Sequence, residues 1–168
     1  MTGSHLDSVP GGCNYDGLAG AMAGIAVAAA ALRCGGHRRG IHAIAMRGEE
    51  SPWFGTAYVG SRLMLGHSTL DEIGTLPRID SGISLREHLD ALGYAGAPVM
   101  PISRDTVAGF FELHIEQGPV LLGQDLPLAV ATYIRGNIRY PEARCLGEYG
   151  HSAALPRAYR HDAVLAVA

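Results

Sequence analysis

The longest apolar block in this chain is an alanine-rich run over residues 18–32. Asp16 precedes the run as a candidate N-cap, and Gly35 and Gly36 follow it with the left-handed conformation that commonly ends a helix. We therefore predict one helix here, almost wholly buried. The run is short and has no flanking topology signal, so it does not predict a membrane span.

Shorter apolar blocks predict strands and a smaller helix. Residues 41–46 and 110–115 have the composition of strands, the first covered on both faces, and polar side chains gather where each strand ends. Ser84 opens a capping box, and the helix that follows closes at Gly93. Ligands of open α/β sheets sit beyond the carboxyl ends of the strands, so these polar strand ends predict an α/β fold with one site.

The pattern changes from about residue 126. Two further strands are expected over residues 128–134 and 139–146, and a helix is expected from residue 157 that still runs at residue 168. A helix that stops without a cap indicates that sequence is missing. We therefore expect the chain to be a fragment.

Composition and charge exclude several classes of protein. The 168 residues, 48% of them apolar, fit one ordinary globular domain. A net charge of −3 with interspersed signs provides neither a basic face for nucleic acid nor a polybasic anchor for a membrane. The chain opens without a basic and apolar leader, and its 3 cysteines are widely spaced, so we expect free thiols and a cytoplasmic location.

Candidate chemistry begins within the first residues. His5 and Asp7 alternate on an extended segment and project to one side, where His5 can coordinate a metal ion and Asp7 can support it. Asp16 has two carboxylate oxygens, which can span a pair of ions roughly 3.5–4 Å apart. In isolation, the same carboxylates serve equally well as turn and cap residues around Pro10.

The adjacent glutamates Glu49 and Glu50 follow the strand predicted over residues 41–46. Adjacent side chains point in different directions, so one carboxylate can bind a metal ion while the other acts as general base on an attacking water. A pair of glutamates is more often a solvated surface charge. The apolar strand before the pair and Trp53 after it count against a solvated surface position, and both readings stay open from the residues alone.

Two histidines and an arginine add polar groups to this picture. His114 lies on the second predicted strand, where Glu112 and Glu116 would share its face, although a histidine among apolar residues is more often a satisfied core residue. His151 lies in a loop and can donate a hydrogen bond to a substrate, and a plain loop histidine is an equal alternative. Arg139 is a candidate carboxylate binder, with a surface arginine as the commoner alternative.

These motifs together resemble the amidohydrolase branch of the M20 metallopeptidase family. That branch comprises N-carbamoyl-L-amino-acid hydrolases, β-ureidopropionases and allantoate amidohydrolases. The resemblance runs along nearly the whole chain, in the order of the family, and the segments that carry it are GSHLDSVP, YDG, EES-x-WF with the later GSR, LHIEQGP, and GEYGHSAALPRAYRHDA. LHIEQGP is the most specific of these segments.

The resemblance implies a binuclear metal centre with zinc as the expected ion and manganese, cobalt or nickel as alternatives. The implied ligands of the two divalent ions are His5, Asp16, Glu50 and His114. Asp16 would bridge the ions, Asp7 would orient a histidine ligand, and Glu49 would be the general base. The implied reaction converts an N-carbamoyl-L-amino acid to amino acid, ammonia and carbon dioxide.

The resemblance also implies substrate contacts and a homodimer. Gln117 would lie near the substrate, and His151 would help to stabilise the oxyanion of the reaction across the dimer. Asn137 occupies the place of a frequent glutamine and is a further substrate contact by position. The expected partners are therefore a small ureido or carbamoyl compound and a second copy of the chain.

In domain terms, the resemblance implies part of a zinc-exopeptidase-like catalytic domain over residues 1–126. Residues 127–168 would be the incomplete start of a smaller α+β dimerisation, or lid, domain. Family members have a sheet segment before GSHLD and return to the catalytic domain later, where the last histidine ligand of the second ion lies. Both parts are expected to be absent here.

Two other functions stay open from the sequence. The first is a dipeptidase or acyl-amino-acid deacylase of the same family, against which His114 argues, because peptidase relatives carry a carboxylate at that position. The second is a catalytically incomplete fragment that binds a metal ion and catalyses nothing.

Overall fold

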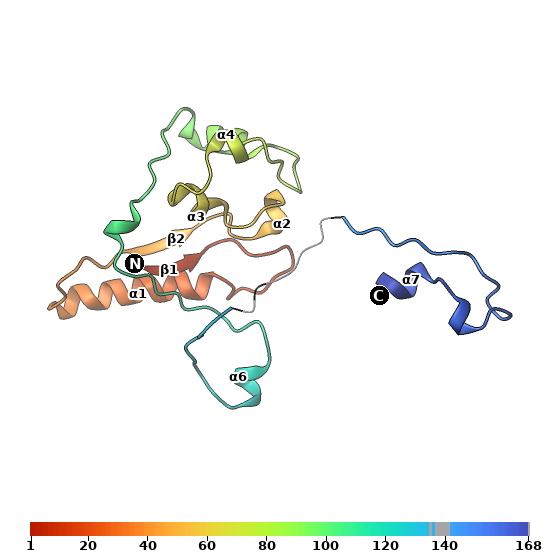
Figure 1. Ribbon diagram of the computed structural model, residues 1–168. Helices are drawn as coiled ribbons and strands as arrows, with labels where there is room; N and C mark the ends of the chain where they lie inside the picture. The colour runs from red at the N-terminus through yellow and green to blue at the C-terminus, as the bar shows by residue number, and fades with distance from the viewer. Residues whose placement is uncertain (135, 137–141, 168) are drawn as a thin grey trace. The chain divides into compact units, whose positions relative to one another are not determined.

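The computed structural model describes residues 1–134, 136 and 142–167 (Figure 1). The chain divides into two compact units, Met1–Asp125 and Leu126–Ala168. In the described residues, no helix is both long and apolar enough to cross a membrane. The predicted α/β class is confirmed as a partial α/β domain, since the first unit combines parallel strands with helices.

A short parallel sheet forms the centre of the first unit. Strand β1 (Thr2–His5) pairs with β2 (Ala43–Met46), so that Thr2 lies opposite Ala43 and His5 opposite Met46. The strand predicted over residues 41–46 is thus confirmed in most of its length. Its expected burial on both faces is wrong: β2 alternates exposed and half-buried residues, because the helix that packs on this sheet covers one face.

The strand predicted over residues 110–115 is reduced to a single pairing. Phe111 bridges to Thr2 in the parallel sense, and its carbonyl accepts a hydrogen bond of 3.2 Å from the Gly3 amide. From residue 112 the chain leaves the strand edge and runs against α1, where the Leu113 carbonyl lies next to Gly20. Residues 112 and 116 therefore do not share a strand face with His114.

Helix α1 (Leu18–Cys34) confirms the predicted alanine-rich helix and its end at Gly35, which has φ 64 and donates to the Ala31 carbonyl at 2.9 Å. Two details of the prediction are wrong. Gly17 is the N-cap, and no described side chain caps the helix, because the Asp16 carboxylate faces other groups. The helix is buried only along one face, at Gly20, Ala21 and Gly24, since the sheet covers that face alone.

Glycines let this helix approach the sheet closely. A Cβ atom at Gly20 would overlap the carbonyl oxygen of Leu113, and one at Gly24 would lie 2.8 Å from the Cα atom of Gly3. Such distances leave no room for a side chain between helix and strand. The backbone of α1 therefore rests on β1 itself, and the two elements lie side by side (Figure 1).

A group of short helices follows β2 (Figure 1). These helices are α2 (Ser51–Phe54), α3 (Val59–Met64), α4 (Leu70–Ile73) and α5 (Leu85–Leu89). Their core is built on Val59, Ile73 and Leu85. The predicted capping box at Ser84 is confirmed, and Gly93 with φ 87 lies in the turn that ends this segment; a second box at Thr69 escaped the sequence analysis.

The second unit holds little regular structure in its described residues. A 3₁₀ turn (Arg157–Tyr159) precedes α7 (Ala163–Val167), so the continuous helix predicted from residue 157 is wrong. Its interruption has a local cause, because the Asp162 carboxylate accepts hydrogen bonds from the amides of Val164 and Leu165 and so starts a new helix.

The two strands predicted in this unit are also not formed. Residues 128–134 have no strand partner among the described residues, and side chains such as Val130 stay exposed. Of the strand expected over residues 139–146, residues 139–141 lie outside the described residues and residues 142–146 are not in a strand. Strand composition alone cannot form a sheet without a neighbouring strand to accept its hydrogen bonds.

Candidate metal centre

His5 ends β1 and is nearly completely buried, with 2% of its surface exposed. Its Nδ1 atom lies 2.6 Å from the backbone carbonyl oxygen of Asp7. A carbonyl oxygen only accepts hydrogen bonds, so Nδ1 must carry the proton and donate it. In the neutral ring, the other nitrogen, Nε2, is therefore left with a lone pair.

His114 shows the same arrangement from a distant part of the chain. Its Nδ1 lies 2.8 Å from the carbonyl oxygen of Ile115, which places a proton on Nδ1 and, in the neutral ring, leaves the lone pair on Nε2. The two imidazole rings lie with their centroids 5.7 Å apart. Both Nε2 atoms approach the same atom, Oδ1 of Asp16, at 3.6 Å from His5 and 3.3 Å from His114.

Asp16 is 6% exposed, and its two carboxylate oxygens have different surroundings. Oδ2 accepts a hydrogen bond of 2.9 Å from the side-chain amide of Gln117. Oδ1 is buried without a hydrogen-bond donor among the described residues. With both rings neutral, two imidazole lone pairs and a carboxylate oxygen converge here, an arrangement that a cation in the space between them would stabilise.

This arrangement fits a divalent metal ion. Imidazole nitrogen and carboxylate oxygen are the donor types that zinc and similar ions accept, and the three donor atoms lie within 4.8 Å of one another. Both histidines also make, through Nδ1, the hydrogen bond to a carbonyl oxygen that metal-bound histidines make with the nitrogen that does not bind the ion. The predicted set of His5, Asp16 and His114 is thus brought together, and its role as a ligand set stays a prediction.

The two glutamates at the end of β2 form a second group with His5. Donor atoms of His5, Glu49 and Glu50 also lie within 4.8 Å of one another, and Glu49 Oε2 is 4.0 Å from His5 Nε2. Burial raises the pKa of Glu49 above its ordinary value; His5 and His114 lower it in part, and Asp7 and Asp16 raise it further. Burial, followed by the neighbouring Glu49, also raises the pKa of Glu50.

Asp7 holds the two glutamates through their backbone. Its carboxylate oxygens accept hydrogen bonds from the amides of Glu49 at 3.2 Å and of Glu50 at 3.0 Å. Its contact with the His5 ring is made by the backbone carbonyl instead. The predicted orientation of His5 by Asp7 thus involves a main-chain atom, and the carboxylate has a connecting role that the sequence analysis missed.

Small and buried residues support these groups. A Cβ atom at Gly17, which has φ 66, would overlap the His5 ring, so glycine is needed for the ring to lie against the start of α1. Ser4, fully buried beside His5, donates a hydrogen bond to the Glu112 carboxylate. This bond holds the segment that follows Phe111 against β1. Neither contact was predicted, because both depend on the meeting of distant segments.

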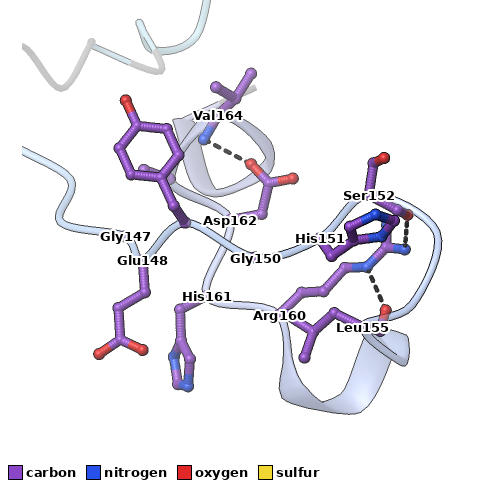
Figure 2. Close-up of a pocket in the computed structure, with 12 residues that line it drawn as sticks. Gly147, Glu148, Gly150, His151, Ser152, Leu155, Arg160, His161, Asp162 and Val164 are labelled. Carbon is purple, nitrogen blue, oxygen red and sulfur yellow. Dashed lines mark hydrogen bonds between the residues drawn. The ribbon is translucent and has the colours of Figure 1, made fainter.

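The second unit contains a cavity of about 470 Å³ that includes His151 (Figure 2). His151 Nδ1 accepts hydrogen bonds from the amides of Ala153 and Ala154, so in the neutral ring the proton is on Nε2, which can donate. Figure 2 shows that the Arg160 guanidinium donates hydrogen bonds to the carbonyl oxygens of Ser152 and Leu155. Among the predicted substrate contacts, Asn137 and Arg139 lie outside the described residues.

Comparisons with known proteins place this geometry in context. No protein-family model matches the chain. The chain is 31% identical over 173 residues to an N-carbamoyl-L-amino-acid amidohydrolase of Pseudomonas sp. (strain NS671), covering 100% of the chain and 41% of the relative. It is 33% identical over 169 residues to an allantoate amidohydrolase of Escherichia coli (strain K12), covering 99% and 40%.

Solved structures agree with these relatives. A hydantoinase/carbamoylase family amidase from Burkholderia ambifaria matches with a TM-score of 0.64 and 26% identity, over 99% of this chain and 40% of that one. A putative amidohydrolase/peptidase from Burkholderia cenocepacia matches with a TM-score of 0.66 and 27% identity, over the same shares. The resemblance predicted from the motifs is confirmed: the chain is homologous along its whole length to about 40% of the length of these amidohydrolases.

Proposed function

We propose that this chain carries part of the active site of a metal-dependent hydrolase that cleaves a carbon–nitrogen bond in carbamoyl or ureido compounds. The observation that carries the proposal is the buried, unpaired Oδ1 of Asp16, which two imidazole lone pairs approach. The names of the homologues supply the substrate class. The chain spans about 40% of the length of these relatives, and the activity of the full-length enzymes is proposed for the protein that contains it.

The described residues divide into those that would hold the ions and those that would move protons. His5, Asp16 and His114 would hold one divalent ion, and Glu50 would contribute to a second. When bound, such ions polarise the carbonyl group that is attacked and lower the pKa of water. Zinc as the native ion, a homodimeric assembly and a cytoplasmic location remain part of the proposal.

Glu49 is the proposed general base. Its pKa is raised by burial, which makes its carboxylate a better proton acceptor than an exposed glutamate. It would accept a proton from the attacking water as the oxygen–carbon bond forms. It would return that proton to the departing nitrogen as the carbon–nitrogen bond breaks, and the carbamate left behind would release ammonia and carbon dioxide.

Four polar residues are proposed as substrate contacts. Gln117 lies beside Asp16 and is proposed near the substrate, and the Nε2 proton of His151 is available to an oxyanion. Asn137 is proposed as a further contact from its position in the resemblance, and Arg139 because a guanidinium group can bind a carboxylate through two hydrogen bonds. The second unit would then be the start of a lid or dimerisation domain.

Assays of the chain with an N-carbamoyl-L-amino acid, allantoate and a dipeptide test the proposal, with Zn²⁺, Mn²⁺ or Co²⁺ supplied. Hydrolysis of a carbamoyl or ureido compound is expected, and Glu49→Gln should reduce its rate at least about a hundredfold, the usual contribution of a general base, with bound metal unchanged. Preferential cleavage of the dipeptide would support the peptidase alternative. Tight metal binding without hydrolysis of any of the three would support the catalytically incomplete alternative.

A further inference from the structure

The two oxygens of the Asp16 carboxylate are not equally available. Oδ1 faces the Nε2 atoms of His5 and His114, while Oδ2 accepts the hydrogen bond from Gln117 Nε2 at 2.9 Å. A carboxylate accepts only, so the amide end that faces it is the NH₂ group. An NH₂ group that points at Oδ2 occupies the position from which a cation would approach that oxygen.

Gln117 is held in this position by its own segment. Its backbone has φ 56, which is uncommon for a residue other than glycine. The preceding residue, Glu116, accepts hydrogen bonds of 2.9 Å from the amides of Val120 and Leu121 at the start of α6 (Val120–Gly123). The turn that carries Gln117 is therefore fixed on both sides of the side chain that reaches Asp16.

His5 also limits how many ions the described residues can hold. Both donor groups of the described residues, one with Asp16 and His114 and one with Glu49 and Glu50, contain His5. Its Nδ1 is engaged with the Asp7 carbonyl, so a single nitrogen, Nε2, serves both groups. One lone pair coordinates one ion. An ion beside the glutamates, with a first ion already on Nε2, needs another ligand, and Asp16 has Oδ2 as the carboxylate oxygen that does not face the two imidazoles.

We propose that Gln117 controls the loading of the metal centre. The first ion binds His5, Oδ1 of Asp16 and His114 with Gln117 in place, and the second ion binds only when the amide of Gln117 leaves Oδ2. Loading is then ordered, with a weaker second step. This inference rests on the proposed metal centre and deepens it, since it assigns Gln117 to the control of metal occupancy in addition to any contact with substrate.

Calorimetric titration of the metal-free chain with Zn²⁺, repeated with Co²⁺, tests the inference without any measurement of activity. The wild type should show one tight event and a second, weaker one. In Gln117→Ala the hydrogen bond that competes for Oδ2 is absent, so the second event should become about tenfold tighter, or appear where the wild type shows none. The first event should change by less than about threefold, because Gln117 does not contact Oδ1.

Gln124→Ala is the matched control, because Gln124 is the other glutamine of the chain and makes no side-chain hydrogen bond among the described residues. It should bind both ions as the wild type does. If Gln117→Ala does not fold, as judged by circular dichroism, Gln117→Asn is used. Asparagine tolerates the left-handed backbone, and its side chain is one methylene too short to reach Oδ2.

Two variants distinguish a failure of the metal centre from a failure of the control by Gln117. Metal uptake by His5→Ala that equals the wild type would overturn the metal centre itself. Loss of the tight event in His5→Ala, together with an unchanged second event in Gln117→Ala, would overturn only the control by Gln117. Uptake of two ions with equal affinity by the wild type, or loss of both events in Gln117→Ala, would overturn it as well.

Discussion

Replacing Asp7 by alanine should separate the two strand ends that carry the candidate site. In the wild type, the Asp7 carboxylate at the end of β1 accepts two hydrogen bonds from the residues after β2, at 3.2 Å from the Glu49 amide and 3.0 Å from the Glu50 amide. Alanine removes both acceptors and leaves two amides dependent on water.

The magnitude follows from the charge and the exposure of the acceptor. A hydrogen bond to a charged group contributes about 1.5–3 kcal/mol, and the lower end applies because Asp7 is half-buried and the bonds are of ordinary length. Removal of Asp7 also relieves its repulsion of the Glu49 carboxylate, which is one cause of the raised Glu49 pKa. We therefore expect a loss of about 2 kcal/mol in the free energy of unfolding.

Denaturant titration, followed by circular dichroism, measures this loss. Asp7→Asn should cost about half as much, because its single amide oxygen can accept from one of the two backbone amides. Asp71→Ala is the control: this side chain is 96% exposed and paired with Arg86, so its removal should cost less than about 1 kcal/mol. Equal unfolding midpoints for Asp7→Ala and Asp71→Ala would refute the assigned role of the carboxylate.

Two further predictions concern packing and pH. Gly20→Ala should destabilise the chain by about 1–3 kcal/mol, because the new methyl group would overlap the Leu113 carbonyl. Gly123→Ala, whose methyl group meets open space, should be neutral or slightly stabilising. Equal effects of the two substitutions in thermal unfolding would contradict the close packing of α1. Hydrogen bonds from the Ser84 side chain and backbone lower the pKa of Glu87 below its usual value. The folded state then binds this proton less readily, so the contribution of Glu87 to stability is present above the ordinary glutamate pKa, about 4.5, and is lost as the pH falls through the lowered value. The unfolding midpoints of wild type and Glu87→Gln should therefore differ at pH 7 and converge at low pH; a constant difference would argue against the charged cap.

Local signals were predictable from the sequence because their partners lie within a few residues. The capping box of Ser84 and Glu87 and the end of α1 at Gly35 are such cases, and both are confirmed. The motif order likewise predicted the resemblance to the amidohydrolases, which the relatives confirm. Each cap and each separate motif is contained in a short stretch of chain.

Features that depend on distant partners were predicted less well. Asp16 has the chemistry of a helix cap as much as that of a ligand, and only its approach to His114 and Gln117 distinguishes the two. Residues 110–115 have strand composition, yet of these residues only Phe111 pairs with β1 before the chain turns along α1. The same holds for the exposed face of β2, because the apolar composition of a strand does not determine which other element covers each of its faces.

The contacts around Asp16 also set an order for folding. The hydrogen bond from Gln117 joins positions 101 residues apart, and that from Ser4 to Glu112 joins positions 108 residues apart. Closing so large a loop has an entropic cost that grows with the logarithm of its length, and contacts of this kind form late. During synthesis, β1 and α1 emerge long before the segment that completes their site. An ion shared by His5, Asp16 and His114 would close the same loop, so metal binding would stabilise the topology of the unit as well as prepare its chemistry.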